Sequence, residues 1–343
     1  MSNISVLNTV LDASAKRRED RRRFLRMSGG AAALAGGMTL LAACDSDSDN
    51  DGGPISGPAP SPAPSPTPPA TGVSEADVLN FALNLEYLEA QFYLFAVNGT
   101  GLPANQLTGG GAQGPVTGGR QVNFTDPVVR QYAREIAADE AAHVAFLRRT
   151  LGSSAVAQPA LNISGDANGA FTAAARAAGV VPATGTFDPY ASDENFLLGA
   201  FLFEDVGVTA YMGGVALLNT PAFIEAAAGI HAVEAYHAGL VRTVLYNKGI
   251  QTPMLRTAAQ QISDARDALD GTANTGLLNQ GGDRDQGIGD STTANLVPTD
   301  QNGIAFVRSP GQVLNIVYLN AGANVSSGGF FPGGVNGTVR STG

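Results

Sequence analysis

Residues 140–143 read Glu-Ala-Ala-His, and residues 234–237 read Glu-Ala-Tyr-His. A spacing of three residues is close to one helical turn, so the glutamate and the histidine of each stretch share a helical face and can converge on one point. The chain has only three histidines, and two of them stand in this motif. The doubled motif predicts two helices that bring the same pair of polar side chains to a shared site.

Two further stretches carry a glutamate that is followed, seven residues later, by a tyrosine. They are Glu86 with Tyr93 and Glu204 with Tyr211. Seven residues are two helical turns, so each pair shares a face. Leucine and phenylalanine surround both glutamates, which predicts that these carboxylates are buried and need partners of opposite charge.

The two sets of motifs form an internal repeat. The Glu–Tyr pairs lie 118 residues apart, whereas the Glu-x-x-His motifs lie 94 residues apart. A constant offset within each set predicts that one pair of helices repeats the other, with a longer loop inside the first pair. Helix pairs related by a twofold axis should build a site with the same symmetry.

Helix start and stop signals divide the chain around these motifs into four long helices. Each predicted start has a capping residue or a proline in the first turn. We expect helices over residues 78–97 after the capping box of Ser74 and Asp77, 127–151 after Asp126, 193–218 after Ser192, and 221–248 after Thr220, the last stopping at Gly249.

The remaining segments show few strand patterns. We expect a glycine-rich loop over residues 98–125, a loop over 152–191 with a short helix near 171–178, a helix over 252–269 and a short helix over 309–318. Long helices joined by short and long connections are typical of a bundle. The predicted fold class is all-α, an antiparallel four-helix bundle over residues 73–250 with a C-terminal helix and loop-rich extension over residues 251–343.

The N-terminal part reads as an export signal and a tether. Residues 21–25 read Arg-Arg-Arg-Phe-Leu, and a weakly apolar stretch with four glycines follows, which is marginal for spanning a bilayer. This order is typical of an export signal, here of the twin-arginine type, over residues 1–43. Leu-Ala-Ala-Cys at residues 41–44 resembles a lipobox and predicts lipidation of Cys44. Residues 44–72, rich in Asp, Pro and Ser, predict an extended tether, so we expect an exported periplasmic or cell-envelope protein with a membrane anchor.

Charge and cysteine content limit the partners and the ligands. The net charge is −10, of which residues 1–43 carry +4 and the rest −14. An acidic domain repels phosphates, so we expect no nucleic-acid partner. Cys44 is the only cysteine, so a metal site in the bundle must use nitrogen and oxygen ligands. The sequence does not predict the oligomeric state.

The six polar residues of the four helices predict a centre for two metal ions. Ionised glutamates inside a bundle are costly without partners. Two divalent cations balance four carboxylates, and two neutral imidazoles complete the ligand set; this is the ligand pattern of di-metal carboxylate bundles. The predicted metal ligands are Glu86, Glu140, His143, Glu204, Glu234 and His237. The alternative is that these side chains lie on exposed faces and hold no metal.

The choice of the ligand on the first helix and the role of the tyrosines remain open. Glu89, one turn after Glu86, is an alternative ligand, but only Glu86 has the glutamate-to-tyrosine spacing that recurs in the repeat. Tyr93 and Tyr211 are either core aromatics or catalytic phenols that bond a ligand carboxylate or supply an electron.

Three more residues close to the motifs have alternative roles. His231 is a core or surface histidine, a partner of a ligand, or a third histidine ligand. Asp139 and Asp205 each adjoin a predicted ligand. They either orient the histidines or face solvent.

Residues 79–93, LNFALNLEYLEAQFY, resemble the ferritin-like superfamily and are most similar to its branch of desiccation-related proteins. Tail residues 305–310, 313–318 and 328–332 resemble the same branch, so the likeness covers about residues 73–343. The resemblance implies two iron ions, or alternatively two manganese ions, at the six predicted ligands. It does not determine the reaction, and the tether, long loops and tail argue against a closed iron-storage cage.

Three functions are compatible with these features. The first is an exported di-metal, di-iron oxidoreductase that oxidises Fe(II) or reduces O2 or peroxide, in envelope stress or desiccation protection. The second is a dimanganese enzyme similar to a catalase. The third is a non-enzymatic stress-protective or interaction module in which metal only stabilises the fold. Oxygen and imidazole ligands do not distinguish iron from manganese.

Overall fold

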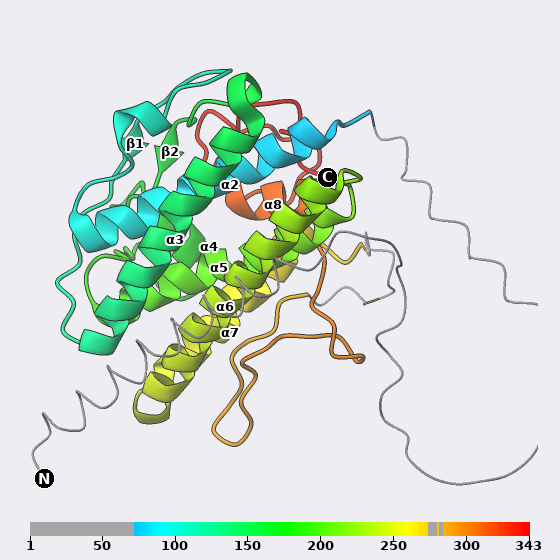
Figure 1. Ribbon diagram of the computed structural model, residues 1–343. Helices are drawn as coiled ribbons and strands as arrows, with labels where there is room; N and C mark the ends of the chain where they lie inside the picture. Colours follow the sequence, from blue (N-terminus) through cyan, green and yellow to red (C-terminus); the bar gives the residue numbers. More distant parts are fainter. Residues whose placement is uncertain (1–71, 274–279, 281–283) are drawn as a thin grey trace, which may run out of the picture. The chain divides into compact units, whose positions relative to one another are not determined.

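The computed structural model describes residues 72–273, 280 and 284–343 (Figure 1). The expected export signal, Cys44 and nearly all of the expected tether lie outside the described residues. Four long helices form the centre of the domain, and they confirm the predicted all-α bundle. They are α2 (Glu75–Asn98), α3 (Pro127–Leu151), α5 (Asp193–Val215) and α6 (Pro221–Gln251).

The four helices are arranged as two pairs. Helix α2 packs along α3, and α5 packs along α6; contacts of α2 with α5 and of α3 with α6 join the pairs. Figure 1 shows the four helices side by side. Each pair therefore combines one helix with a Glu–Tyr pair and one helix with a Glu-x-x-His motif, as the repeat predicts.

Capping interactions at the start of the helices match the sequence pattern. Ser74 and Asp77 form the expected capping box of α2, and the Asp126 carboxylate accepts from the backbone of the first turn of α3. Thr220 has no side-chain cap; instead, Glu75 Oε1 accepts a hydrogen bond of 2.7 Å from Thr220 N, so a side chain of α2 caps α6. A cap from another helix fixes both helix starts together.

The predicted ends of two helices were wrong. Helix α6 does not stop at Gly249 but continues to Gln251. Gly249 is buried in close contact with Arg256, where a Cβ would lie 2.6 Å from Arg256 Cγ. The helix ends at Gln251 because the next residue, Thr252, precedes Pro253 and is sterically excluded from the helical region. Helix α5 ends at Val215, earlier than residue 218, and a short turn follows.

Short elements lie in the two long connections. The first contains the 3-10 turn η1 (Ala104–Gln106) and strand β1 (Val116–Thr117); the second contains η2 (Gly152–Ser154), strand β2 (Leu161–Asn162) and α4 (Ala170–Ala177). β1 and β2 pair in parallel with Val116 opposite Leu161, which fastens the two loops to each other.

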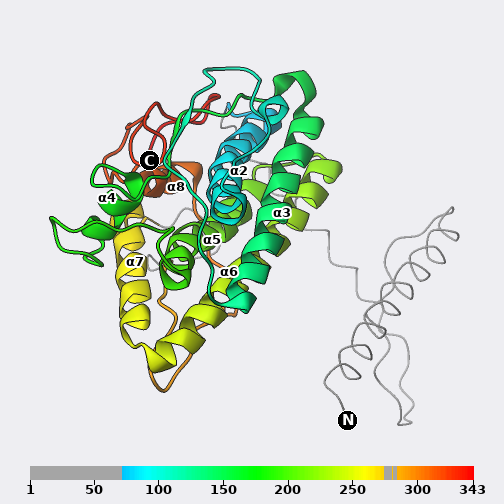
Figure 2. The same ribbon diagram turned by 90° about the vertical axis from the view of Figure 1, so that its left-hand side faces the viewer.

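The C-terminal extension packs back onto the bundle. Helices α7 (Met254–Asp270) and α8 (Pro310–Val317) both contact α5 (Figure 2). Phe330 follows α8, and its ring lies 5.1 Å from that of Phe171 in α4 and 5.0 Å from that of Phe203 in α5. Aromatic contacts at these distances stabilise beyond the area that they bury, so the extension belongs to the same core.

Among the described residues, α5 is the one helix that is long and apolar enough to cross a membrane. Most of it is buried inside the bundle, and it carries the buried Glu204 and Asp205. Its apolar character is that of a core helix surrounded by other helices.

Buried arginine–aspartate pairs join α5, α6 and α7. Asp205 Oδ2 accepts from Arg242 Nη1 at 2.6 Å and from Arg266 Nη2 at 2.9 Å. Arg266 also pairs with Asp285 Oδ1 at 2.6 Å. All four side chains are nearly inaccessible to solvent. Because charges inside a protein are tolerated only when they are paired, these contacts hold the extension in one place.

The network continues to the segment that leads into α8. Arg308 pairs with Asp285 and, at 2.6 Å, with Asp270 at the end of α7. Asp267, Asp270 and Asp285 lie close enough to be considered as a metal site, but the guanidinium groups of Arg266 and Arg308 already neutralise Asp270 and Asp285. This cluster is therefore structural.

We expect Asp285→Ala to lower the free energy of unfolding by about 3 kcal/mol, because it removes one partner from two buried guanidinium groups. Urea denaturation followed by circular dichroism measures the loss. Asp264→Ala is the control: Asp264 is exposed on α7 and, within the described residues, bonds only Gln260, so its change should stay within about 0.5 kcal/mol. Equal losses in the two variants would contradict the role of the network.

Candidate metal centre

The six predicted ligands come together inside the bundle. Their burial and proximity define two overlapping groups, each compact enough for one cation. The first group contains Glu86 of α2, Glu140 and His143 of α3, and Glu234 of α6; the second contains Glu140, Glu204 of α5 and His237 of α6. The expectation that the carboxylates point inward is met by all four glutamates.

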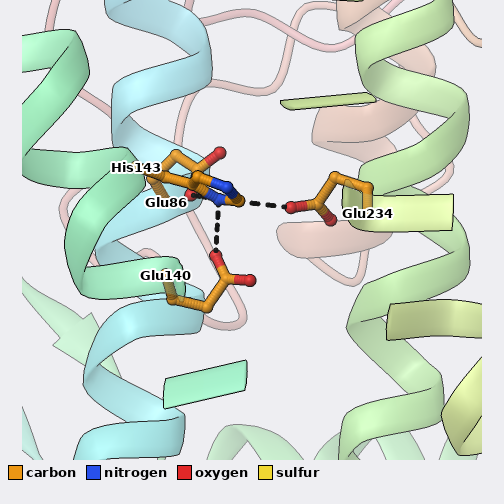
Figure 3. Close-up of side chains that lie close together, drawn as sticks. All are labelled: Glu86, Glu140, His143 and Glu234. Carbon is orange, nitrogen blue, oxygen red and sulfur yellow. Dashed lines mark ion pairs between the residues drawn. The ribbon is translucent and has the colours of Figure 1, made fainter. Parts of the chain in front are cut away.

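In the first group, His143 Nδ1 lies in the middle of three carboxylates (Figure 3). It is 3.3 Å from Glu86 Oε2, 3.5 Å from Glu140 Oε2 and 3.7 Å from Glu234 Oε1. Glu234 reaches this group from α6, across the bundle from α2 and α3 (Figure 3). Side chains from three helices therefore meet at one position inside the bundle.

The second group repeats this arrangement with fewer residues. His237 Nδ1 lies 3.0 Å from Glu140 Oε1 and 3.6 Å from Glu204 Oε2. Glu140 belongs to both groups and directs one carboxylate oxygen to each, so it would help to hold both cations if two were bound. Its repeat partner Glu234 lies in the first group only. The centre is thus less symmetrical than the repeat predicts.

Eight ligand atoms in the centre are buried and have no hydrogen-bond partner in the described part of the chain. They are Glu86 Oε2, both oxygens of Glu140, His143 Nδ1, Glu204 Oε2, both oxygens of Glu234, and His237 Nδ1. Buried polar atoms are almost always bonded, so a group of eight that face one another needs a bound species. Six oxygens and two nitrogens suit iron or manganese.

The charges in the centre are strongly coupled. Burial raises the pKa of Glu86 to about 7 and that of Glu204 to about 8. Burial also acts on Glu140, but the positive charge of the two histidines that face it outweighs burial and lowers its pKa to about 2. Burial opposes the charged form of both histidines, yet the carboxylates raise the pKa of His143 to about 11 and that of His237 to about 9. Without metal, protons supply the positive charge that the carboxylates need.

Each tyrosine of the two Glu–Tyr pairs bonds a glutamate of the other helix pair. Tyr93 of α2 donates to Glu204 Oε1, and Tyr211 of α5 donates to Glu86 Oε1. Burial raises the pKa of both phenols well above the usual value, so they remain donors. Each bond occupies one carboxylate oxygen and leaves the other, Oε2, facing the centre. This orienting contact is one of the roles that the sequence left open.

The residues beside the ligands have different roles. Asp139 contacts His237 Nε2 at 3.2 Å and can orient that imidazole, as the sequence suggested. Asp205 does not orient a histidine, because its carboxylate pairs with Arg242 and Arg266. His231 is only half-buried and belongs to neither ligand group, and burial lowers its pKa.

Glu89 is a fifth buried glutamate that sequence reasoning treated only as a substitute for Glu86. It is 5% exposed, and burial together with the neighbouring carboxylates raises its pKa well above the usual value. It belongs to neither ligand group. Its repeat counterpart, 118 residues later, is Gly207. This difference between the two halves of the repeat could have shown, from the sequence alone, that Glu89 does not belong to the repeated ligand set.

The comparisons with known proteins agree with this architecture. A family model described as the ferritin-like domain matches residues 74–247. The chain belongs to the ferritin-like family. It is 32% identical over 279 residues to the ferritin-like catalase Nec2 of Nesocodon mauritianus, with 78% of this chain and 86% of that relative covered.

A second relative places the chain near the desiccation-related branch that the sequence resembles. The desiccation-related protein PCC13-62 of Craterostigma plantagineum is 30% identical over 250 residues, which cover 70% of this chain and 76% of the relative. No solved structure matches the chain.

We expect the metal-free protein to lose stability as pH rises from about 5 to 9. Folding raises the pKa of Glu86 to about 7, Glu204 to about 8 and His237 to about 9, so protons bind the folded state more tightly and their release destabilises it. Glu140, held at about 2, does not titrate in this range. Chelator-treated protein unfolded in urea at several pH values tests the slope.

Metal-loaded protein is the comparison for this pH series. Metal ions compete with protons for the same atoms, so the stabilisation that metal provides should increase over the same pH range. A metal-free protein whose urea midpoint rises or stays constant from pH 5 to 9 would contradict the proton-held centre.

Proposed function

We propose that this protein holds two iron or manganese ions at Glu86, Glu140, His143, Glu204, Glu234 and His237 and disproportionates hydrogen peroxide. One peroxide is oxidised to O2 and a second is reduced to two waters, with two electrons and two protons passing from the first to the second. The observation that carries the proposal is the set of eight buried nitrogen and oxygen atoms that face one another without a hydrogen bond, in two groups that share Glu140. The name of the relative from Nesocodon mauritianus supports a catalase reaction.

The metal pair would supply the two-electron redox couple that the reaction requires. The chain's own residues hold and orient the reacting groups. Glu140 faces both groups and fixes the separation of the two positions. Tyr93 and Tyr211 keep their protons and align the carboxylates of Glu204 and Glu86. The apolar core around the centre excludes bulk water, which strengthens each of these interactions.

Metal content and oxygen release test the proposal. Loaded protein should contain two metal ions per chain by elemental analysis and release O2 from hydrogen peroxide. Glu140→Gln should bind less than one ion per chain and lose at least about 100-fold in rate, because the shared ligand is lost. Glu135→Gln, an exposed change in the same helix, is the control and should match the wild type. Loaded protein that releases no O2 with either metal would overturn the catalase assignment.

Two alternatives give different results in the same experiment. A ferroxidase would oxidise Fe(II) with O2 or peroxide and release no O2 when loaded with manganese. A protective module would bind metal, remain inert to both oxidants, and preserve a second protein during drying; the similarity to a desiccation-related protein favours this candidate.

We also propose that the protein is exported and anchored at the cell envelope through Cys44. The basic run at residues 21–26, the Leu-Ala-Ala-Cys stretch and the proline-rich residues after it support this proposal. Wild-type protein should sediment with membranes, and Cys44→Ser should be released into the soluble fraction. Equal distribution of the two forms in fractionated cells would contradict a lipid anchor.

A further inference from the structure

A small cavity lies between α2, α5 and the C-terminal extension. The cavity has a volume of about 20 Å³, which is room for one or two water-sized molecules. Its lining consists of Leu85, Leu88, Glu89, Leu202, Phe203, Val206, Gly207, Ile316, Val317 and Phe330. Glu89 is the only one of these residues with a polar side chain.

Glu89 can form a hydrogen bond to a small molecule in this cavity. Glu89 is only 5% exposed, and no residue in the described part of the chain donates a hydrogen bond to its carboxyl group. A buried polar group without a partner loses the hydrogen bonds that it would make with water. A small polar molecule in the cavity would restore one of them.

Gly207 lies between the cavity and the metal centre. A Cβ at this position would lie 2.3 Å from Glu234 Oε2 and 3.3 Å from Glu89 Oε1. The absence of a side chain therefore leaves room for both carboxylates, and residue 207 lines the cavity while lying next to Glu234. Glu89 and Gly207 occupy equivalent positions of the repeat, so the two halves of the repeat contribute different residues to the cavity.

The outer wall of the cavity is supplied by the extension. Ile316 and Val317 are the last two residues of α8, and the ring of Phe330 packs against those of Phe171 and Phe203. All are nearly inaccessible to solvent. A wall of packed side chains has a defined size and resists expansion, so the cavity can select its guest by volume.

We propose that this cavity is a chamber that binds hydrogen peroxide beside the metal centre before it reacts. Glu89 is the positioning residue that forms a hydrogen bond to the peroxide. The wall from α8 is a size filter that excludes organic hydroperoxides. The inference rests on the proposed catalase function and names its substrate class. The chamber accepts a molecule of two oxygen atoms and rejects one that carries a tert-butyl group.

Substrate size tests the filter. With ascorbate as the two-electron donor, which reduces hydrogen peroxide to two waters or tert-butyl hydroperoxide to tert-butanol and water, wild-type protein should have a far larger kcat/KM for hydrogen peroxide than for tert-butyl hydroperoxide. Val317→Ala widens the chamber and should shift this ratio toward the larger peroxide by about tenfold, since removing methyl groups from a pocket has effects of that size. Val313→Ala is a matched control, because Val313 is equally buried in α8 but does not line the cavity. Equal use of the two peroxides by the wild type, or equal shifts in the two variants, would overturn the filter.

Substitution of Glu89 tests its positioning role. Glu89→Leu should raise KM for hydrogen peroxide by about tenfold, the worth of one hydrogen bond, while Glu89→Gln retains a polar group and should recover most of the affinity. Elemental analysis should still find two metal ions per chain in both variants. Loss of metal in Glu89→Gln would make Glu89 a ligand and overturn the assignment.

A readout without turnover separates failure of the chamber from failure of the proposed function. Crystals of the metal-loaded protein exposed to xenon gas should show a xenon atom between Glu89, Val206 and Phe330. If xenon binds there and neither peroxide is consumed, the catalase function fails while the chamber stands as a small-molecule site. If peroxide is consumed and no xenon binds, the chamber is wrong.

Discussion

Burial of four carboxylates at one point is the constraint on which this structure depends. Carboxylates without partners inside a bundle would repel one another and lose their hydration, so the fold tolerates them only with matching positive charge. Two histidines supply part of that charge in the metal-free state, and the pKa of His143 rises to about 11 as a result. Two divalent cations would supply it more completely. The arrangement of helices, tyrosines and cavity follows from keeping this cluster dry and aligned.

The two halves of the domain serve the centre together, not separately. Tyr93 aligns Glu204 and Tyr211 aligns Glu86, so each helix pair orients a carboxylate of the other. Neither pair can form the centre alone. The symmetry is incomplete: Glu140 is shared between the groups while Glu234 is not, and Glu89 faces Gly207. The duplicated framework thus carries different residues at equivalent positions, Glu89 in one half and Gly207 in the other.

The C-terminal extension completes the bundle. Its arginine–aspartate network reaches Asp205, the residue after Glu204, so the extension and a ligand-bearing helix share buried charges. Phe330 packs into an aromatic cluster and lines the cavity. The extension is therefore part of the functional core, although its sequence is rich in glycine and asparagine and predicted mainly loops.

The sequence by itself determined the all-α class, the helix starts and the six inward-facing side chains, because capping residues and Glu-x-x-His spacing act within a few turns of one helix. Tertiary structure decided what depends on residues far apart in the chain. Gly249 lies within α6 and packs against Arg256, Asp205 pairs with Arg242 and Arg266, and Glu140 belongs to both candidate ligand groups. Local pattern fixes which face a side chain occupies; only the packing of separate helices decides which atoms it meets there.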